Sequence, residues 1–557
     1  MSEVRVGVFV CHCGTNIGGF LDVPELVKYA LSLPNVAFTQ ENKYTCSETG
    51  LSEIKKAILE IQLNRIVVAS CTPRTHEPLF RSACKEAGLN PFLFQFVNIR
   101  DQCSWVHMHD KEAATKKAKD LIRMGVANAV LLEPLEELKI DVNPKAVVIG
   151  GGISGMTSAI SLANRGFEVR LIEKSEKLGG TLNNLYKLYP TQIDASNLVT
   201  AKIGEIEKNS RIKVLTSSQV LDVDGFVGNY TVKIKQNNKV QNYDAGVIIV
   251  ATGADVYKPS DLYSYDGERV ITQLELEKAL KRGEVKAQRI IMIQCAGART
   301  KERPYCSKVC CPTALKNALL IKEKNDDSQL YILYRDMVTP GTEFEDLYGK
   351  AREAGINFIK YSPEKEPIVE NESLKVYDEL LGEELTLPYD LVVLSTPMVA
   401  RSDSKELAQK LKVPVDEHGF YLEAHVKLRP VDFATDGIFV CGCAHWPSNV
   451  DESIFQAYGA SSRASIPMSV GYVTTEPLIP VVDEEKCTGC GLCEMNCPFK
   501  AIKIEKKEKG RKANVIAASC KGCGTCGAGC PQKAITMKHF TDDQIIAQVR
   551  ALAEVTS

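Results

Sequence analysis

The sequence of 557 residues predicts an α/β protein in three parts, and three observations carry this prediction. Apolar strand-like runs alternate with helical segments along most of the chain. A glycine-rich turn at 150–155 follows one buried strand, and a cysteine run at 487–497 is repeated at 520–530. We therefore expect an N-terminal α/β domain over 1–140, a Rossmann-type dinucleotide-binding domain over 141–475 and a small α+β module over 476–557.

Composition narrows the class of protein. The apolar share of 44% is ordinary, and no run approaches the roughly 18 consecutive apolar residues of a membrane span. The net charge of −2 gives no general electrostatic reason to bind nucleic acid or acidic membranes. The start lacks the basic and apolar regions of a signal peptide, so we expect a cytoplasmic protein. Its 20 cysteines then indicate metal ligation or redox chemistry rather than disulfides.

The first 140 residues alternate between strand and helix. Strands are expected at 4–11, 65–70 and 92–97, and helices at 23–31, 51–63 and 111–127. The polar segment 133–144 ends in Asn-Pro and is expected to be a linker.

The second part opens with a dinucleotide-binding motif. Gly150, Gly152 and Gly155 follow a buried strand and supply G-x-G-x-x-G, and a helix is expected at 156–165. The next strand, at 168–172, ends at Glu173, which is positioned to bind a ribose hydroxyl. The helix directs its N-terminal dipole at the phosphates.

Further motifs select the dinucleotide. Lys174 and the pair Gly179–Gly180 resemble the extension that follows the acidic residue in flavoproteins with two dinucleotide folds. The segments 248–253 and 435–442 resemble the second and third flavin signatures of that class, which implies a thioredoxin-reductase-like FAD domain. The third signature usually continues with an acidic residue, but Cys443 stands there. The candidate FAD-binding residues are Gly150, Gly152, Ser154, Gly155, Glu173, Lys174, Gly180, Thr181, Ala251, Thr252, Gly253, Gly442 and Cys443.

The second glycine-rich turn of that class, which binds NAD(P)H, is missing. The corresponding strand at 289–293 runs into Gln-Cys-Ala-Gly-Ala, and a helix is expected from Pro312. Four cysteines stand here instead: Cys295, Cys306, Cys310 and Cys311. They can hold a [4Fe–4S] cluster, remain buried thiols, or form a vicinal disulfide at Cys310–Cys311. We expect electrons to come from a protein partner rather than directly from NADH.

The third part contains the iron–sulfur pattern C-x2-C-x2-C-x3-C-P twice. In a bacterial two-cluster ferredoxin the fourth cysteine of each run binds the other cluster. The spacing therefore predicts two [4Fe–4S] clusters, and zinc, which takes its ligands in pairs, is the less suitable alternative. The two ligand sets are Cys487, Cys490, Cys493 and Cys530, and Cys520, Cys523, Cys526 and Cys497.

Taken together, the motifs resemble the A-type, flavin-carrying component of heterodisulfide reductase. The likeness includes the segments 11–14, 44–47, 69–77, 98–107 and 304–311, and it extends along almost the whole chain. It implies a cluster on Cys295, Cys306, Cys310 and Cys311. It also implies that Lys316 approaches the flavin as a catalytic residue, whereas the alternative is a solvated helix lysine. The implied partners are other subunits of such a complex, a hydrogenase or dehydrogenase subunit, and ferredoxin, with a homodimer inside the larger assembly.

Two features depart from that family pattern. No ferredoxin domain is inserted near 225–234, where methanogen members carry one. The chain also lacks the repeated Cys-Cys-Gly motif with which another subunit of these complexes cleaves the disulfide. We therefore expect disulfide reduction to take place on a partner subunit.

The N-terminal part has cysteines of its own. Cys11, Cys13, Cys46 and Cys71 lie at strand ends or in the loops after them, and the ends of parallel strands meet at one edge of a sheet. They are candidates for a further cluster, and the alternative is a docking domain with buried thiols. Cys84 and Cys103 are expected in the core, and the histidines His76, His107 and His109 in structural hydrogen bonds.

Two functions remain open from the sequence. The first is flavin-based electron bifurcation, in which an electron pair from a partner is divided between a high-potential acceptor and ferredoxin. The second is a relay subunit whose flavin passes electrons without bifurcation. The missing glycine-rich turn argues against a third function, that of an NADPH-dependent flavoprotein related to glutamate synthase.

Overall fold

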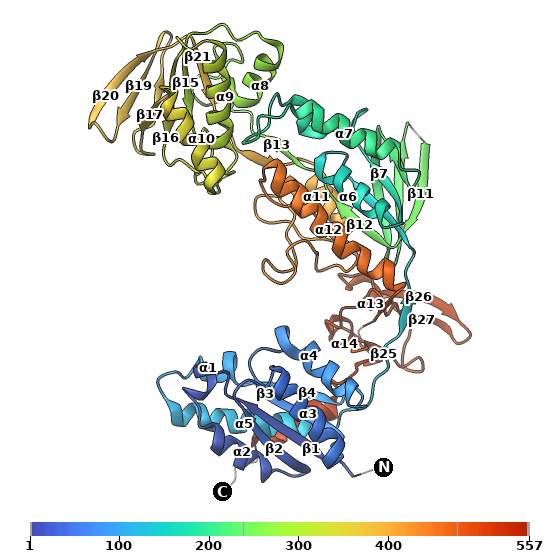
Figure 1. The fold of residues 1–557 in the computed structure, drawn as a ribbon. Helices are drawn as coiled ribbons and strands as arrows, with labels where there is room; N and C mark the ends of the chain where they lie inside the picture. The colour runs from blue at the N-terminus through green and yellow to red at the C-terminus, as the bar shows by residue number, and fades with distance from the viewer. Residues whose placement is uncertain (1–2, 238, 476, 554–557) are drawn as a thin grey trace. The chain divides into compact units, whose positions relative to one another are not determined.

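The computed structural model describes residues 3–237, 239–475 and 477–553 (Figure 1). Contacts divide the chain into two compact units, one of residues 1–139 with 474–557 and the other of residues 140–473. Within the described residues, no helix combines the length and apolar character needed to cross a membrane. The fold is mixed α/β.

A four-stranded parallel sheet organises the N-terminal part, in the order β2-β1-β3-β4. Its strands are β1 (Val6–Cys11), β2 (Val36–Asn42), β3 (Arg65–Ser70) and β4 (Phe94–Asn98). Strands β1 and β3 are almost wholly buried, as strands covered on both faces must be.

Helices cover both faces of this sheet. Helices α2 (Val23–Leu31) and α5 (Lys111–Val130) share one apolar cluster with it. Helices α3 (Glu48–Ile61) and α4 (Pro73–Glu86) share another on the opposite face. Alternate residues of β1 serve the two clusters, Val8 and Val10 the first and Phe9 the second, because successive side chains of a strand point to opposite faces.

Within its described residues, the C-terminal part contains two short antiparallel pairs and three helices. Strand β25 pairs with β28, and strand β26 forms a hairpin with β27. The elements are β25 (Pro480–Val482), α13 (Leu492–Met495), β26 (Ile502–Lys507), β27 (Gly510–Val515), α14 (Thr525–Ala528), β28 (Ile535–Met537) and α15 (Asp542–Ala553).

Helix α15, near the C-terminus, packs against the N-terminal domain. It packs along α5, and Gln544 Nε2 donates to Leu131 O at 3.0 Å. Arg123 of α5 donates to Ala551 O near the end of α15. His539, just before the helix, donates from Nε2 to Glu133 O at 2.8 Å. These contacts place the cysteine-rich part in the same unit as the N-terminal domain.

The other unit begins with a five-stranded parallel sheet in the order β23-β12-β6-β7-β8. Its strands are β6 (Lys145–Ile149), β7 (Glu168–Ile172), β8 (Ile212–Leu215), β12 (Val247–Val250) and β23 (Ile438–Val440). Helices α6 (Ile153–Asn164) and α12 (Val450–Val470) cover one face. The opposite face packs against a three-stranded meander of β9 (Ser218–Phe226), β10 (Asn229–Gln236) and β11 (Lys239–Ala245).

A second five-stranded parallel sheet repeats this design, in the order β14-β21-β15-β16-β17. Its strands are β14 (Val270–Thr272), β15 (Arg289–Ile293), β16 (Gln329–Tyr334), β17 (Asn357–Lys360) and β21 (Leu391–Leu394). One face packs against α8 (Gln273–Arg282), α9 (Cys310–Lys324) and α10 (Thr342–Glu353). The other packs against a meander of β18 (Ile368–Val369), β19 (Ser373–Asp378) and β20 (Glu383–Pro388).

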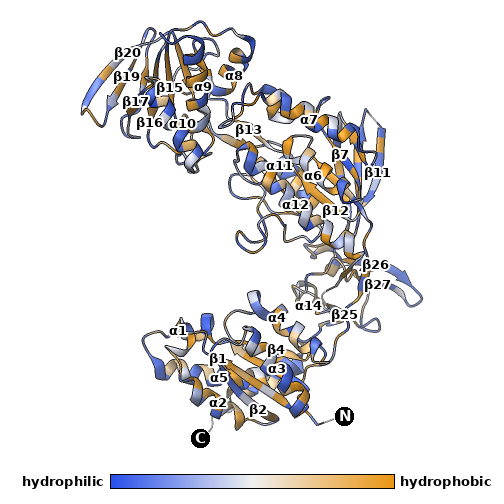
Figure 2. Cartoon of the chain, in the orientation of Figure 1, coloured by the Kyte–Doolittle hydropathy of each residue, from blue (hydrophilic) through white to orange (hydrophobic). Residues whose placement is uncertain are grey.

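Two short strands connect these sheets. β13 (Ala254–Val256) leaves the first sheet and pairs antiparallel with β22 (Met398–Ala400), which returns from the second. Figure 2 shows hydrophobic residues concentrated in the central strands, including β15, and the β26–β27 hairpin largely in the hydrophilic colour. The two sheets of this unit each have an apolar interior on both faces.

Several expected boundaries differ by a few residues, and local capping explains one of them. Helix α3 begins at Glu48 rather than at 51 because the Ser47 side chain accepts from Gly50 N at 3.2 Å and caps it. Helix α6 begins at Ile153, directly after the glycine turn, rather than at 156. Helix α9 begins at Cys310, so Cys310 and Cys311 lie in its first turn instead of before it.

Candidate functional site

The glycine turn between β6 and α6 has the geometry that its motif requires. Gly150 has φ 112°, and a Cβ there would lie 2.2 Å from Ala251 O. A Cβ on Gly155 would lie 1.7 Å from Gly150 O, so only glycine lets the helix approach the strand this closely. Gly152 has open space around its Cα, which leaves room for a ligand to approach the backbone. The three glycines therefore make the turn, admit a ligand and pack the helix.

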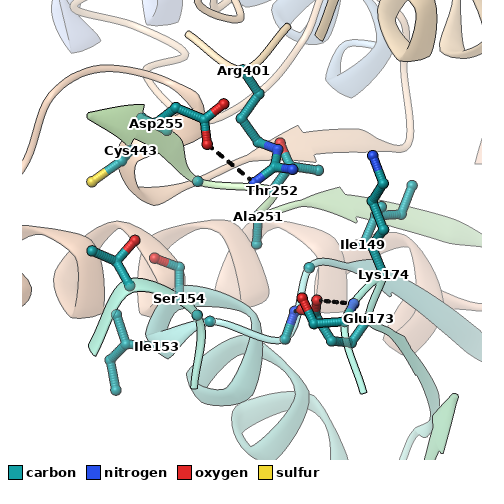
Figure 3. Close-up of a pocket in the computed structure, with 18 of the residues that line it drawn as sticks. Ile149, Ile153, Ser154, Glu173, Lys174, Ala251, Thr252, Asp255, Arg401 and Cys443 are labelled. Atoms are coloured by element: carbon teal, nitrogen blue, oxygen red, sulfur yellow. Dashed lines mark hydrogen bonds and ion pairs between the residues drawn. The ribbon is translucent and has the colours of Figure 1, made fainter. Parts of the chain in front are cut away.

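A crevice of about 600 Å³ opens at this turn (Figure 3). Eleven of the thirteen predicted FAD-binding residues line it: Gly150, Gly152, Ser154, Glu173, Lys174, Gly180, Thr181, Ala251, Thr252, Gly253 and Cys443. The other two lie behind its wall. Gly155 packs α6 onto the turn, and a Cβ on Gly442 would lie 2.1 Å from Ser154 Oγ.

Charged groups sit at the end of β7. Both carboxylate oxygens of Glu173 accept from backbone amides, one from Gly151 N at 2.6 Å and the other from Ser175 N at 2.7 Å. Lys174 pairs with Asp403 at 2.9 Å. Glu173, the predicted ribose-binding residue, lines the crevice and is held in place by the backbone of the turn.

Arg401 also reaches the crevice from the loop after β22. It pairs with Asp255 at 3.5 Å, as drawn in Figure 3, and with Asp403 at 3.3 Å. The sequence motifs did not indicate Arg401 or Asp403, because both arrive from the second connection between the sheets. Both residues reach the crevice because β13 pairs with β22.

Cys443 lines the crevice where related flavoproteins carry an acid. Its Sγ donates to Ser448 O at 3.3 Å, and burial raises the pKa of its thiol. A neutral thiol at this position provides a weak donor instead of a negative charge. Any ribityl hydroxyl held here must therefore use other acceptors of the crevice wall.

The residues of this crevice fit a dinucleotide. Thr252 lines it with a buried Oγ1 that has no hydrogen-bond partner within the described residues. The helix N-terminus and the open face of Gly152 suit a pyrophosphate, and Glu173 suits a ribose. The volume is in the range of small-molecule sites.

A second cavity, of about 130 Å³, shares part of its wall with the crevice. Thr181, Leu185 and Val256 line both. The second cavity is also lined by Lys316 and by Cys310 from the first turn of α9. The predicted catalytic lysine and one predicted cluster ligand are therefore neighbours of the flavin crevice.

Lys316 is buried, which excludes the solvated alternative. It is 1% exposed and pairs with Glu277 of α8, which is fully buried. Its Nζ also donates to Lys187 O at 2.8 Å. Burial lowers the pKa of Lys316, and the Glu277 carboxylate opposes that shift. Sequence reasoning missed Glu277, whose position on an amphipathic helix gave no sign of its partner.

The four cysteines that replace the second glycine turn come together between β15, α9 and β21. Cys310 Sγ donates to Thr396 O at 3.5 Å, and Cys311 Sγ donates to Asp336 O at 3.8 Å. Burial raises the pKa of Cys310 and Cys295, and it raises that of Cys311 to about 12. In each case the neighbouring cysteines of the set raise the pKa further. Without a bound metal, burial and mutual repulsion therefore favour the neutral thiols over the thiolates.

Two arginines lie next to Cys295 of this set. Arg299 hydrogen-bonds to Cys295 and pairs with Asp336 at 2.8 Å. Arg335, whose side chain is 6% exposed, pairs with Glu366 at 2.7 Å and lies close enough to lower the pKa of Cys295. Both cations favour negative charge on the sulfur ligands. The sequence showed the cysteines but not the arginines.

In the C-terminal part, two small cavities divide the eight cysteines. One is lined by Cys487, Cys490, Cys493 and Cys530. The other is lined by Cys497, Cys520, Cys523 and Cys526. These are the two crossed sets that the spacing predicts. Backbone amides point at the sulfurs, with Ala501 N donating to Cys497 at 3.2 Å and Ala534 N to Cys530 at 3.3 Å.

The N-terminal cysteines gather at the carboxyl edge of their sheet. Cys11 Sγ accepts from Cys13 N at 3.3 Å and from Thr45 N at 3.4 Å. Burial raises the pKa of Cys13 and Cys46, and Cys11 and Cys71 raise both further. Arg100 approaches Cys13 Sγ at 3.9 Å. The cysteines thus lie around the same edge of the sheet, with the Arg100 cation beside Cys13.

Cys84, Cys103 and His107 have structural surroundings. Cys84 and Cys103 are fully buried in the core, as expected. His107 contacts Lys117 Nζ at 3.4 Å. Across the described residues, no group of three or more His, Cys, Asp or Glu side chains is close enough to bind a single metal ion.

Comparisons with known proteins agree with these sites. Residues 144–298 match the family described as pyridine nucleotide-disulphide oxidoreductase, and residues 480–537 match the 4Fe-4S dicluster domain. These matches indicate FAD for the first region and 4Fe-4S clusters for the second.

Similarity to characterised proteins extends over the whole chain. It is 40% identical over 650 aligned residues to the A-type component of the H(2):CoB-CoM heterodisulfide,ferredoxin reductase of Methanothermobacter thermautotrophicus, covering 99% of this chain and 98% of the relative. It is 33% identical to the A-type component of the ferredoxin/F(420)H(2)-dependent CoB-CoM heterodisulfide reductase of Methanosarcina acetivorans, covering 98% of this chain and 81% of the relative. Among solved structures, thioredoxin reductase of Lactococcus lactis has 18% identity and a TM-score of 0.43, and covers 59% of this chain and all of its own.

Proposed function

The chain belongs to the family of A-type heterodisulfide reductase components, and from this we propose that it is the flavin hub that bifurcates electron pairs within such a complex. As a member of that family it is part of an oxidoreductase. The bound FAD would exchange electrons in pairs with one partner and singly with iron–sulfur clusters. The chain's own residues bind and orient the flavin and the clusters and set the charges around them.

One observation carries the proposal. The flavin crevice and the cavity of Cys310 and Lys316 share part of their wall. A cofactor in the crevice and a cluster on Cys295, Cys306, Cys310 and Cys311 would then be neighbours across that wall. In an ordinary two-dinucleotide flavoprotein the second domain brings a nicotinamide to the flavin. Here the cysteines would supply a one-electron route at the same domain.

Lys316 is the proposed catalytic residue. It is held between Glu277 and Lys187 O, both within the same cavity wall. A protonated lysine beside the isoalloxazine would stabilise negative charge on the reduced ring. Burial lowers the pKa of Lys316 and favours the neutral amine, and the Glu277 carboxylate opposes that shift.

Partner subunits would supply the remaining chemistry. The names of the relatives mention hydrogen, ferredoxin and F420H2 as reactants of their own complexes. By analogy we propose a donor protein, ferredoxin as one acceptor and, as the second acceptor, a disulfide bound by a different protein of the complex. Cys310–Cys311 is the one Cys-Cys pair in the sequence, and both members are assigned to a cluster, which supports disulfide cleavage elsewhere.

An anaerobic spectroelectrochemical titration of the intact, cofactor-loaded chain tests the proposal. Bifurcation requires the second electron to leave the flavin at a lower potential than the first. The flavin band should therefore bleach in a single two-electron transition. Two separate one-electron transitions, with the first at the higher potential, would instead establish the chain as a relay without bifurcation.

A further inference from the structure

The hairpin β26–β27 carries the densest positive charge of the cysteine-rich part. Between residues 500 and 512 the sequence has seven basic residues against two acidic ones, Glu505 and Glu508. We call the hairpin with its preceding lysine the basic hairpin; its cations are Lys500, Lys503, Lys506, Lys507, Lys509, Arg511 and Lys512.

Part of this charge is unpaired. Lys507 pairs with Glu484, and Lys509 with Glu485 at 3.5 Å. Lys503, Lys506 and Arg511 are exposed, and they form no ion pair with any residue that the structure describes. A cluster of like charges repels itself, and an oppositely charged partner removes that repulsion.

The basic hairpin is fixed against one of the two cysteine sets. Ile504 of β26 lines the same cavity as Cys487, Cys490, Cys493 and Cys530. Lys512 Nζ donates to Cys487 O at 2.6 Å. A Cβ on Gly489 would lie 2.2 Å from Arg511 O, so the loop that carries Cys490 lies directly on the hairpin backbone. The positive charge therefore borders this cysteine set.

An apolar surface lies beside the charge. Cys490 is exposed, and α13 presents Leu492 and Met495, which are 38% and 73% exposed. Interfaces between proteins commonly combine an apolar centre with a charged or polar rim. Here an exposed ligand cysteine, two apolar side chains and a basic rim belong to one small module.

We propose that the basic hairpin, with Leu492 and Met495, is the docking surface for an acidic one-electron carrier protein. The inference rests on the proposed function, because it takes Cys487, Cys490, Cys493 and Cys530 to hold a cluster. In the exchange, one electron passes between the carrier and the centre on these cysteines, so that one is oxidised as the other is reduced and no bond is made or broken. Ferredoxin is the acceptor in the proposed function, and the test below runs the exchange in reverse. Electrostatic attraction brings the carrier to the hairpin. Contact with Leu492 and Met495 then keeps the carrier close to the exposed Cys490.

Charge complementarity predicts how the encounter responds to salt. Attraction between opposite patches raises association rates by about 10- to 1,000-fold at low ionic strength. Salt shortens the screening length from about 30 Å at 0.01 M to about 8 Å at 0.15 M. Electron transfer from an acidic carrier should therefore slow steeply as salt is added.

The test uses the full chain loaded with flavin and clusters, mixed anaerobically in a stopped-flow instrument with a reduced acidic bacterial-type ferredoxin. The variant is Lys503→Glu/Lys506→Glu/Arg511→Glu. The matched control, Lys233→Glu/Lys235→Glu/Lys239→Glu, places the same reversal on the exposed hairpin β10–β11 of the other unit. The second-order rate constant should fall at least tenfold in the variant at low salt and lose its salt dependence. In the control it should stay within twofold of the wild type.

The opposite results overturn the inference. Equal rates in the variant and the control, or a wild-type rate that does not depend on salt, would show that the hairpin does not bind the carrier. Iron content and the electron paramagnetic resonance spectrum establish that the variant keeps its clusters, so that lost folding is not mistaken for lost docking. The flavin titration described above does not depend on these charges. Its outcome therefore tests the proposed function separately from the docking surface.

Discussion

Lys316 of α9 and Glu277 of α8 form an ion pair in which both side chains are withdrawn from solvent. A buried pair gains little stability over apolar residues, but loss of one partner leaves an uncompensated charge. Glu277 also accepts from Tyr186 N at 2.9 Å, so the carboxylate is fixed from a second side. This geometry holds a cation beside the flavin crevice, and the first two predictions follow from it.

Replacing Lys316 with Met should lower the two-electron reduction potential of the flavin. One charge-assisted contact contributes about 1.5–3 kcal/mol, which for a two-electron couple corresponds to about 30–60 mV. Lys322→Met, on the same helix but outside this cavity, should leave the potential unchanged. Spectroelectrochemistry measures both potentials. Equal potentials in the two variants would show that Lys316 does not stabilise the reduced flavin.

Replacing Glu277 with Gln should make the flavin potential more sensitive to alkaline pH. Burial lowers the pKa of Lys316, and Glu277 counters that shift. Without the carboxylate, Lys316 loses its proton at a lower pH, so the potential should begin to fall at a lower pH than in the wild type. Potentials measured between about pH 7 and 10 test this, and superimposable curves would contradict it.

Replacing Gly155 with Ala should weaken FAD binding. The added Cβ would lie 1.7 Å from Gly150 O, and the turn or the helix must move. Gly204→Ala on helix α7 (Ala195–Glu207) is the matched control, since its Cβ meets no atom within 4 Å. We expect the affinity for FAD to weaken at least about tenfold in the first variant and to stay unchanged in the control, as measured by FAD titration. Normal FAD content in Gly155→Ala would show that the crevice is not the flavin site.

Replacing Cys530 with Ala should remove the cluster of the first cysteine run, although Cys530 belongs to the second. Cys530 lines the cavity of Cys487, Cys490 and Cys493. Iron should fall by about four atoms per chain. Cys84→Ala, at a core thiol, is the control for a simple cysteine loss. Loss of the cluster on Cys520 instead would mean that the two sets are not crossed.

Acidification should loosen the contact between α15 and the N-terminal domain. Burial lowers the pKa of His539, which donates to Glu133 O, and the Arg81 cation lowers it further. When the contact opens, His539 regains its ordinary pKa and binds a proton more readily. The contact is therefore fully stable above about pH 6.5, and its stability declines as the pH falls through the lowered pKa of the closed state.

Amide hydrogen exchange in α15 measures this loosening, and it should quicken between about pH 7 and 5 after correction for intrinsic rates. His539→Asn removes the titrating group and suits the positive φ of 61° at this position. Its exchange should not change with pH in the same way. A wild-type helix with unchanged protection at about pH 5 would contradict the assignment.

Local motifs carried most of what the sequence could predict. This holds for the glycine turn, the strand ending at Glu173 and the crossed cysteine runs. Each depends on residues a few positions apart, so the spacing of those residues predicts its geometry. Helix α4 was harder to predict because Pro78 lies inside it, and β2 because its residues are only half buried. Both elements depend on packing against the sheet rather than on a local pattern.

The partners of the site residues could not be predicted in this way. Glu277 meets Lys316 across 39 positions of sequence, and Arg100 meets Cys13 across 87. Arg401 enters the crevice only because β13 pairs with β22. Such pairs form because strands and helices that are distant in the sequence pack together. The local hydrophobic pattern does not predict that packing.

We propose that the second domain of the FAD unit, which is of nicotinamide-binding type, holds a cluster beside the flavin. The most direct measurement is the iron-to-FAD ratio of the anaerobically purified chain, with Cys306→Ala beside it. We expect about twelve irons per FAD with three clusters, or about sixteen if the N-terminal cysteines hold a fourth, and a loss of about four in the variant. A ratio of about eight, unchanged in Cys306→Ala, would contradict it.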